Sequence, residues 1–286
     1  MIFRIGTALC FLLKLMATAG SRLPVLYLAH GGGPMPLMGD PSHTSMVSFM
    51  KRVGRKLGNR PKALCIISAH WEEDTVHIST GAEKLLYDYY GFPPETYKVE
   101  YRPPGAVAAA EKTKKLLESA GFTGINTVNR GFDHGVFVPL KLMFPDASIP
   151  TFQISLLKTL DAARHVQIGQ ALRQLRDDGV LIVGSGMSFH NMRAFSFAGG
   201  QATAESVEFH NWYKSVVENR DGRLHELLTE WKDRAPHAKF CHPREEHLIP
   251  LMVTAGAAES DEHGEMIWEE SLLGAQVGSA AFGRID

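Results

Sequence analysis

The sequence contains few cysteines, no excess of charge and no long apolar run, and each of these absences excludes a class of protein. Its three cysteines, Cys10, Cys65 and Cys241, are too few and too scattered for a disulfide framework or a thiolate zinc cluster. Thirty basic and 31 acidic residues give a formal net charge of −1, so there is no general electrostatic basis for binding nucleic acid or a membrane surface. The scarcity of cysteine fits a reducing compartment, and we expect a cytoplasmic protein.

Residues 1–22 form a basic segment without acidic residues. Its apolar stretch, Ala8–Leu13, is too short to span a bilayer, and no later segment approaches roughly 20 uninterrupted apolar residues. The composition fits a secretory or mitochondrial leader and equally an N-terminal extension without a targeting role, and both interpretations stay open. We expect residues 23–286 to form one domain, because no linker or repeat interrupts them.

Short apolar runs alternate with helix-like stretches along most of the chain. The runs typical of strands buried on both faces are Val25–Ala29, Ala63–Ala69, Thr151–Ser155 and Val180–Gly184. The predicted helices are Ala106–Ala120, Asp161–Asp178, Ala204–Glu218, Arg223–Lys232 and Glu245–Ala257. This alternation predicts an α/β fold with a mostly parallel central sheet and helices on both faces. We expect the Gly- and Pro-rich stretches 31–41 and 91–104 to be long functional loops.

Thirteen histidines are the most unusual feature of the composition. His30 and His70 each end a predicted strand, and His190 follows another strand after a short turn. In open α/β sheets, ligands bind beyond the carboxyl ends of the strands. Any one of these histidines is as easily explained as a buried, hydrogen-bonded side chain. Three of them at one sheet edge favour a metal site, because imidazole is a common metal ligand.

Two further histidines have neighbours that suit a functional site. His134 follows Asp133, and His247 lies at the start of the last predicted helix. For the histidines in polar or amphipathic surroundings we expect a solvated surface position; these are His43, His77, His165, His210, His225, His237 and His263. The sequence alone does not decide the place of His242.

Five motifs in order resemble those of the class III extradiol ring-cleavage dioxygenases, in the branch that includes DOPA 4,5-dioxygenase. The motifs are His30-Gly-Gly-Gly-Pro34, Ser68-Ala-His70-Trp71, Phe132-Asp-His134-Gly135, Gly184-Ser-Gly-Met-Ser-Phe-His190-Asn191 and His242-Pro-Arg-Glu-Glu-His247. The resemblance covers about residues 24 to 283. It implies that residues 23–286 are an extradiol dioxygenase-like catalytic domain, with a metal site at the carboxyl ends of the strands.

The resemblance also implies roles for particular residues. It implies that His30, His70 and His247 ligate one divalent metal ion, either Fe(II) for dioxygenase activity or Zn(II). His190 matches the acid–base residue, and His134 matches a histidine that binds or polarises the substrate. Many members of the class use two histidines and a glutamate, so Glu246 is a reserve ligand.

The implied partners are a small aromatic diol, of catechol type and DOPA-like, and molecular oxygen. Two other functions stay open: a zinc-dependent hydrolase of the same fold, and a metal-binding protein without catalysis. The sequence does not decide the substrate, the ring-cleavage position or the oligomeric state. Five tyrosines precede Pro103, and we expect them to wall the pocket: Tyr87, Tyr89, Tyr90, Tyr97 and Tyr101.

Overall fold

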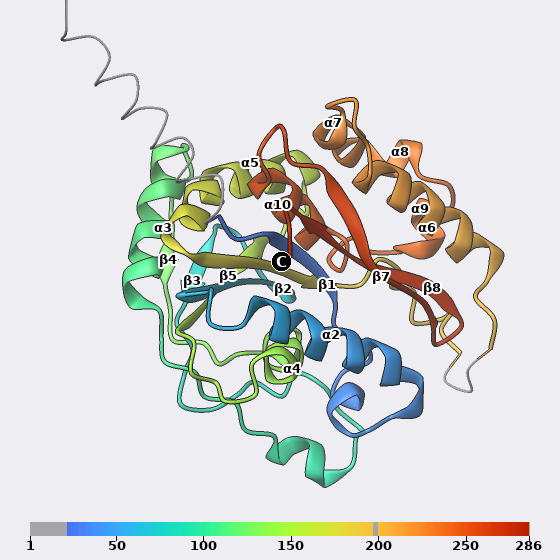
Figure 1. The fold of residues 1–286 in the computed structure, drawn as a ribbon, viewed down its shortest axis with the longest axis horizontal. Helices are drawn as coiled ribbons and strands as arrows, with labels where there is room; N and C mark the ends of the chain where they lie inside the picture. Colours follow the sequence, from blue (N-terminus) through green and yellow to red (C-terminus); the bar gives the residue numbers. More distant parts are fainter. Residues whose placement is uncertain (1–21, 197–199, 286) are drawn as a thin grey trace, which may run out of the picture.

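A computed structural model describes residues 22–196 and 200–285. The possible leader, except Arg22, therefore lies outside the described residues. The chain forms a single α/β domain around an eight-stranded sheet of order β4-β3-β5-β2-β6-β1-β8-β7 (Figure 1). This result confirms the predicted fold class. Within the described ranges, no helix has the length and apolar character needed to cross a membrane.

The centre of the sheet consists of four parallel strands in the order β5-β2-β6-β1, all with buried side chains along most of their length. Their bounds are β1 Val25–Ala29, β2 Ala63–Glu73, β5 Thr151–Leu157 and β6 Val180–Gly186. The outer strands are β3 His77–Ser79, β4 Asn126–Thr127, β7 Gly264–Leu272 and β8 Ala275–Phe282. Antiparallel pairs join β3 to β5, β8 to β1 and β7 to β8. The parallel centre brings the carboxyl ends of β1, β2 and β6 to one edge.

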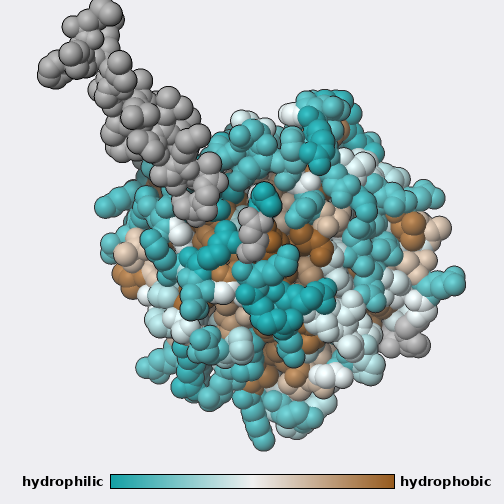
Figure 2. All heavy atoms as spheres, viewed as in Figure 1, coloured by the Kyte–Doolittle hydropathy of each residue, from teal (hydrophilic) through white to brown (hydrophobic). Residues whose placement is uncertain are grey.

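Helices cover both faces of this sheet (Figure 1). On one face lie α2 Thr44–Leu57 and α4 His134–Met143. On the other face lie α5 Ala162–Leu172 and α10 Ile249–Ala257, with α3 Val107–Ser119 beside α5. Near β7 and β8 lie α6 Ala204–Val217, α7 Leu224–Thr229, α8 Trp231–Arg234 and α9 Ala238–Cys241. Polar side chains cover much of the face in Figure 2, with smaller apolar areas between them.

Several element bounds differ from the predicted ones. Strand β2 continues to Glu73, so His70 lies within the strand and not after it. The last long helix begins at Ile249 and not at Glu245, because residues 243–248 form turns and Pro250 occupies the first helical turn. His247 therefore precedes the helix. The predicted helix Arg223–Lys232 is two short helices, α7 and α8.

Three histidines expected at the surface are buried. His43, His165 and His210 have at most 3% exposed area. His165 accepts a hydrogen bond from Leu157 N at 3.0 Å and donates one to Asp161 O. His43 likewise accepts from Gly32 N at 3.0 Å. The prediction was wrong for these three because a polar local sequence does not show that the fold supplies partners for a buried imidazole.

Candidate metal centre

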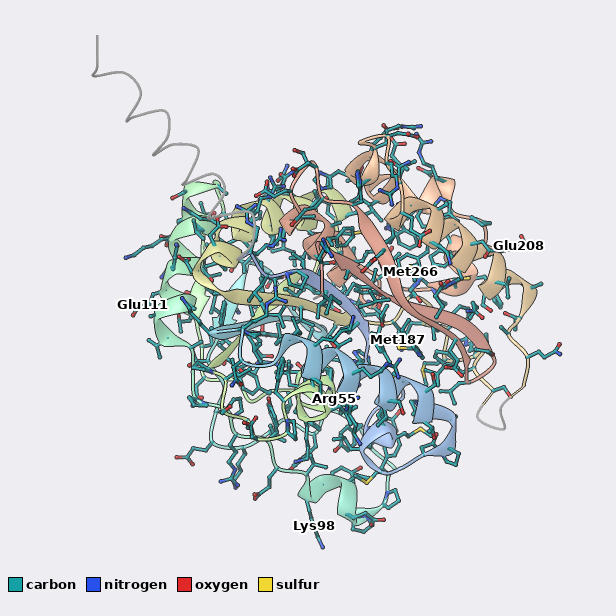
Figure 3. All side chains as sticks on the ribbon, in the orientation of Figure 1. Arg55, Lys98, Glu111, Met187, Glu208 and Met266 are labelled. Carbon is teal, nitrogen blue, oxygen red and sulfur yellow. The ribbon has the colours of Figure 1, made fainter. Side chains whose placement is uncertain are left out.

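A cavity of about 370 Å³ lies at the carboxyl edge of the sheet, and five histidines line it: His30, His70, His134, His190 and His247. His30 directly follows β1, and His70 lies in β2. His190 follows β6 by four residues, and Met187, which is labelled in Figure 3, lines the cavity from the same loop. The structure thus brings every histidine of the predicted site into one cavity.

The carboxylate of Asp88 holds two of these rings. Asp88 Oδ1 accepts hydrogen bonds from both the ring Nδ1 and the backbone N of His134, each at 2.9 Å. Asp88 Oδ2 lies 3.5 Å from His70 Nδ1. Burial opposes ionisation of Asp88, but the hydrogen bonds from His134 hold its pKa below the ordinary value. Both rings are therefore turned so that Nε2 is the nitrogen free for a ligand.

Glu246 holds a second pair of rings in the same way. Its Oε1 lies 2.8 Å from His247 Nδ1 and 3.3 Å from His190 Nδ1. The two rings stack with their centroids 3.4 Å apart and their planes at 16°. Burial raises the pKa of Glu246, but the hydrogen bonds from His190 and His247 outweigh burial and keep that pKa well below its ordinary value. A single carboxylate thus orients two parallel imidazoles.

The fifth ring, His30, is oriented by Ser185. Ser185 Oγ donates its hydrogen to Gly135 O, so it accepts a hydrogen bond from His30 Nδ1 at 3.1 Å. His30 Nε2 then carries the lone pair and lies 3.3 Å from His70 Nε2. Nitrogen ligands about 2.0–2.1 Å from one tetrahedral ion lie roughly 3.3–3.4 Å apart. The separation of these two nitrogens therefore suits a shared metal ion.

The three imidazoles that the resemblance implies as ligands, His30, His70 and His247, have the protonation state that a metal requires. Burial, together with the neighbouring His134, His247 and His190, lowers the pKa of His30 well below its usual value. The same causes act on His70. Burial lowers the pKa of His247 to about 3, although Glu246 opposes the shift. These rings are neutral at pH 7, and neutral imidazole is the form that binds metal.

Among residues 22–196 and 200–285, two groups of side chains have ligand atoms close enough to hold an ion. His30, His70 and His134 form one group, and His190, Glu246 and His247 form the other, with ligand atoms within 4.8 Å of one another in each group. His247 also approaches the first group, since its ring centroid lies 5.3 Å from that of His30 and 4.8 Å from that of His70. These donor atoms therefore fit a divalent metal. The Nε2 atoms of His30 and His70 would be two of its ligands whether the third ligand is His134 or His247.

Close packing against β6 fixes the segment that carries His247. The backbone oxygen of His247 accepts hydrogen bonds from the Tyr27 hydroxyl at 2.8 Å and from Met187 N at 3.0 Å. A Cβ on Gly186 would lie 2.1 Å from that oxygen, so any larger residue would displace the segment. The turn that carries His190 is also held by a backbone hydrogen bond, because His190 N donates to Cys241 O at 2.9 Å.

Sequence reasoning missed three of the supporting residues: Asp88, Ser185 as a partner of His30, and Arg130. Arg130 donates to Asp133 at 2.8 Å and to the backbone oxygen of His70 at 3.1 Å. Asp88 lies among the tyrosines of the loop before Pro103, where no motif distinguishes it from a solvated acid. Only its contact with two imidazoles, contributed by distant segments, reveals its place.

The tyrosine prediction is confirmed in part. Tyr89 and Tyr90 line the cavity, whereas Tyr87 and Tyr97 pack against Tyr89. Tyr101 lies outside the cavity and borders a separate hollow. The loop therefore contributes to the wall, but with two of its five tyrosines.

Comparisons with known proteins agree with this geometry. Residues 21–282 match the family described as the catalytic LigB subunit of aromatic ring-opening dioxygenase. A protein of Hapsidospora irregularis named dioxygenase tasH is 38% identical over 87% of this chain and 82% of its own length. The 4,5-DOPA dioxygenase extradiol of Beta vulgaris is 35% identical over 86% of this chain and 92% of its own.

A solved structure shares the fold. The crystal structure of an uncharacterized protein from Escherichia coli K12 matches with a TM-score of 0.74 at 28% identity, covering 92% of this chain and 100% of that one. The family match spans nearly all of the described chain, and two relatives exceed 30% identity over most of its length. This chain belongs to the LigB family of class III extradiol, aromatic ring-opening dioxygenases.

Proposed function

We propose that the protein is an extradiol dioxygenase that opens the ring of a catechol-type substrate with molecular oxygen. The observation that carries this proposal is the cavity in which five imidazoles converge, each with its Nδ1 beside an oxygen of Ser185, Asp88 or Glu246. Such partners fix the orientation and basicity of metal-binding histidines. The names of the relatives support the reaction class, because two of those compared are named dioxygenases.

We assign the metal to His30, His70 and His247, with Fe(II) as the ion for oxygen chemistry. The nitrogen pair of His30 and His70 supports the first two ligands. The carboxylate partner of His247 and its contact with both rings support the third. The group of ligand atoms within 4.8 Å of one another that contains His30 and His70 has His134 as its third member. Metal analysis of the alanine variants separates the arrangement with His134 from the one with His247. When bound, the ion supplies Lewis acidity toward the diol oxygens and a site for oxygen reduction.

His190 is the proton-transfer residue in this proposal. Its Nδ1 lies beside Glu246, so Nε2 is the nitrogen available to a substrate hydroxyl in the cavity. The imidazole takes a proton from the diol at Nε2 and returns it as the ring opens. The balance of the reaction is simple. One carbon–carbon bond beside the diol breaks, O₂ is reduced, and both of its atoms enter the product.

His134 serves the substrate side of the cavity. Asp88 fixes its ring at Nδ1, which leaves Nε2 to hydrogen-bond a diol oxygen. Tyr89 packs beside it, with ring centroids 6.0 Å apart, and Phe92 packs on Tyr89. These aromatic side chains exclude water from one wall and offer surfaces on which a flat ring stacks.

The test is oxygen uptake by full-length protein loaded anaerobically with Fe(II). With 4-methylcatechol or DOPA and ¹⁸O₂, we expect uptake of one O₂ per ring opened and both labelled atoms in the product. Protein loaded with Zn(II) is the matched control. Ester or amide hydrolysis by the zinc form without oxygen uptake would instead support a hydrolase. Tight metal binding without either activity would support a non-catalytic protein.

A further inference from the structure

The wall of the cavity beyond the histidines is almost entirely apolar. Six apolar side chains form most of it, contributed by four separate segments: Met35, Phe92, Met187, Met192, Phe195 and Leu273. Tyr89 and Tyr90 also line it, and the Tyr89 hydroxyl donates to Thr96 O at 2.7 Å. The exposed side chains of Met192 and Tyr90, at 59% and 92%, are among the residues that line it. A substituent that extends from a metal-bound ring toward this wall therefore meets sulfur and carbon atoms. Thioether and phenyl groups bind apolar substituents well and supply no strong hydrogen-bond donor. The hydroxyl of the exposed Tyr90 can donate a hydrogen bond but carries no positive charge.

No lysine or arginine is among the cavity-lining residues in the described part of the chain. Two guanidinium groups contact residues of the site, and both are paired with carboxylates. Arg130 donates to Asp133 at 2.8 Å. Arg244 donates to Glu72 at 2.6 Å and lies 3.3 Å from Glu246. Neither is free to bind the carboxylate of a substrate.

Backbone amides do not replace the missing cation. The Gly31–Gly33 turn borders the cavity, and clustered amides in such turns can bind anions. Here Gly31 N donates to Met187 Sδ at 3.4 Å, and Gly32 N donates to His43 Nε2 at 3.0 Å. At most one amide of the turn remains for a ligand. The acidic side chain at the cavity wall is Asp88, and its carboxylate repels a carboxylate on a substrate.

We infer that this site selects catechols with a neutral, apolar substituent and discriminates against catechols that bear a carboxylate. The inference rests on the proposed ring-opening function. A carboxylate on the ring substituent loses water in this cavity without gaining a lysine or arginine partner, and it lies in the field of Asp88. An alkyl or ester substituent of equal length loses little hydration free energy and packs against the methionine and phenylalanine side chains of the wall. DOPA, for which several relatives are named, carries the disfavoured group.

The sharpest test compares two catechol substrates that differ only in whether the side chain carries a charge. Methyl 3-(3,4-dihydroxyphenyl)propanoate and the corresponding free acid differ only in the ester, and 4-propylcatechol is the apolar reference. For the Fe(II)-loaded protein at pH 7 we expect kcat/KM to be at least about 10-fold higher for the ester than for the acid, because the acid meets no cation in the cavity. Equal values, or a higher value for the acid, would overturn the inference.

Binding without turnover separates this inference from the proposed function. Cobalt-loaded protein titrated anaerobically with the ester and with the acid gives two dissociation constants from its visible spectrum. If no catechol is cleaved, the ring-opening function fails. The ratio of the two constants then still decides the inference, with a ratio of about 10 in favour of the ester expected and a ratio near 1 contradicting it.

Three variants locate the origin of the selectivity. Met192→Lys places an ammonium at the exposed rim, and we expect the acid-to-ester ratio of kcat/KM to rise by about 10-fold relative to Met192→Gln, which matches it in polarity without charge. Arg193 is exposed and adjacent in sequence. Arg193→Gln should leave the ratio unchanged. If Arg193→Gln lost turnover of the free acid but not of the methyl ester, Arg193 would supply a cation to the site, and the inference would be wrong.

Discussion

The five histidines of the cavity differ from two buried histidines elsewhere, His43 and His165, in what their second ring nitrogen faces. In the set at the cavity, an oxygen of Ser185, Asp88 or Glu246 lies beside each Nδ1, and the Nε2 atoms are left for a ligand. In the scaffold set, His43 and His165 use both ring nitrogens within the protein. Burial is therefore no sign of function in this chain. What distinguishes the cavity set is that one ring nitrogen lies beside a protein oxygen while the other faces a space shared with the other rings.

The largest effect should come from removing a ring of the cavity set that holds the metal. We expect His30→Ala and His247→Ala to be folded and to lose nearly all bound metal and activity, because each removes a proposed ligand. Metal per chain is measured by elemental analysis after purification, with folding checked by circular dichroism. His263→Ala, which changes an exposed histidine, is the control.

The same experiment decides the third ligand. His134→Ala should keep its metal if His247 is the ligand. A variant of His134 that loses metal, beside a variant of His247 that retains it, would reverse the assignment.

A smaller effect should come from His190, which shares Glu246 with His247 but has a different proposed role. We expect His190→Ala to retain metal and to lose about 10²–10⁴-fold in kcat, the usual contribution of a general acid–base group. Steady-state oxygen uptake and metal analysis on the same sample measure both quantities. Loss of metal in this variant would make His190 a ligand instead.

Asp88 offers a test confined to the cavity set. Among the described contacts it lies beside His134 and His70 and beside no scaffold histidine. Asp88→Asn keeps the size of the side chain but weakens its hold on His134 and His70. Partners of this kind contribute about 10–100-fold in metal affinity or activity, and we expect a loss in that range. Competition with a chelator measures the affinity. An unchanged affinity and an unchanged kcat would show that Asp88 has no positioning role.

A scaffold histidine should behave in the opposite way. His165→Ala removes the acceptor for the buried Leu157 amide and the donor to Asp161 O. We expect the free energy of unfolding to fall by about 1–3 kcal/mol, with metal content and kcat unchanged. Urea denaturation measures the first quantity, and His263→Ala again provides the baseline. Metal loss in His165→Ala would remove the distinction between the sets.

The smallest effect is on the pH dependence of stability. Burial lowers the pKa of His165 from 6.5 to about 4, so between these values the unfolded chain binds a proton that the folded protein does not. The free energy of unfolding therefore falls as the pH decreases from about 6.5 to about 4. In chelator-treated protein, His165→Gln should reduce this slope by up to about 1.4 kcal/mol per pH unit. Parallel profiles for the two proteins would contradict the assignment.

Local sequence patterns predicted much of the fold but not its element bounds. The apolar runs placed the four central strands because such runs must be buried on both faces. Strand β2 extends past Ala69 through His70, Trp71 and two glutamates, because pairing with β5 resumes after an irregularity. The last helix begins at Ile249 because residues 243–248 form bends and turns, held by the hydrogen bond from Met187 N, just after β6, to His247 O. Neither contact is local in sequence.

The sequence alone determined the resemblance to the family, through five motifs in order, and this resemblance implied all five cavity histidines. Three of them, His30, His70 and His190, also followed from their position at or after the ends of predicted strands. Only the tertiary structure revealed the roles of Asp88 and Ser185 and the burial of His43, His165 and His210. The physical reason is that a hydrogen-bond partner is defined by distance in space. The residues that pair with these imidazoles come from segments that the sheet brings together.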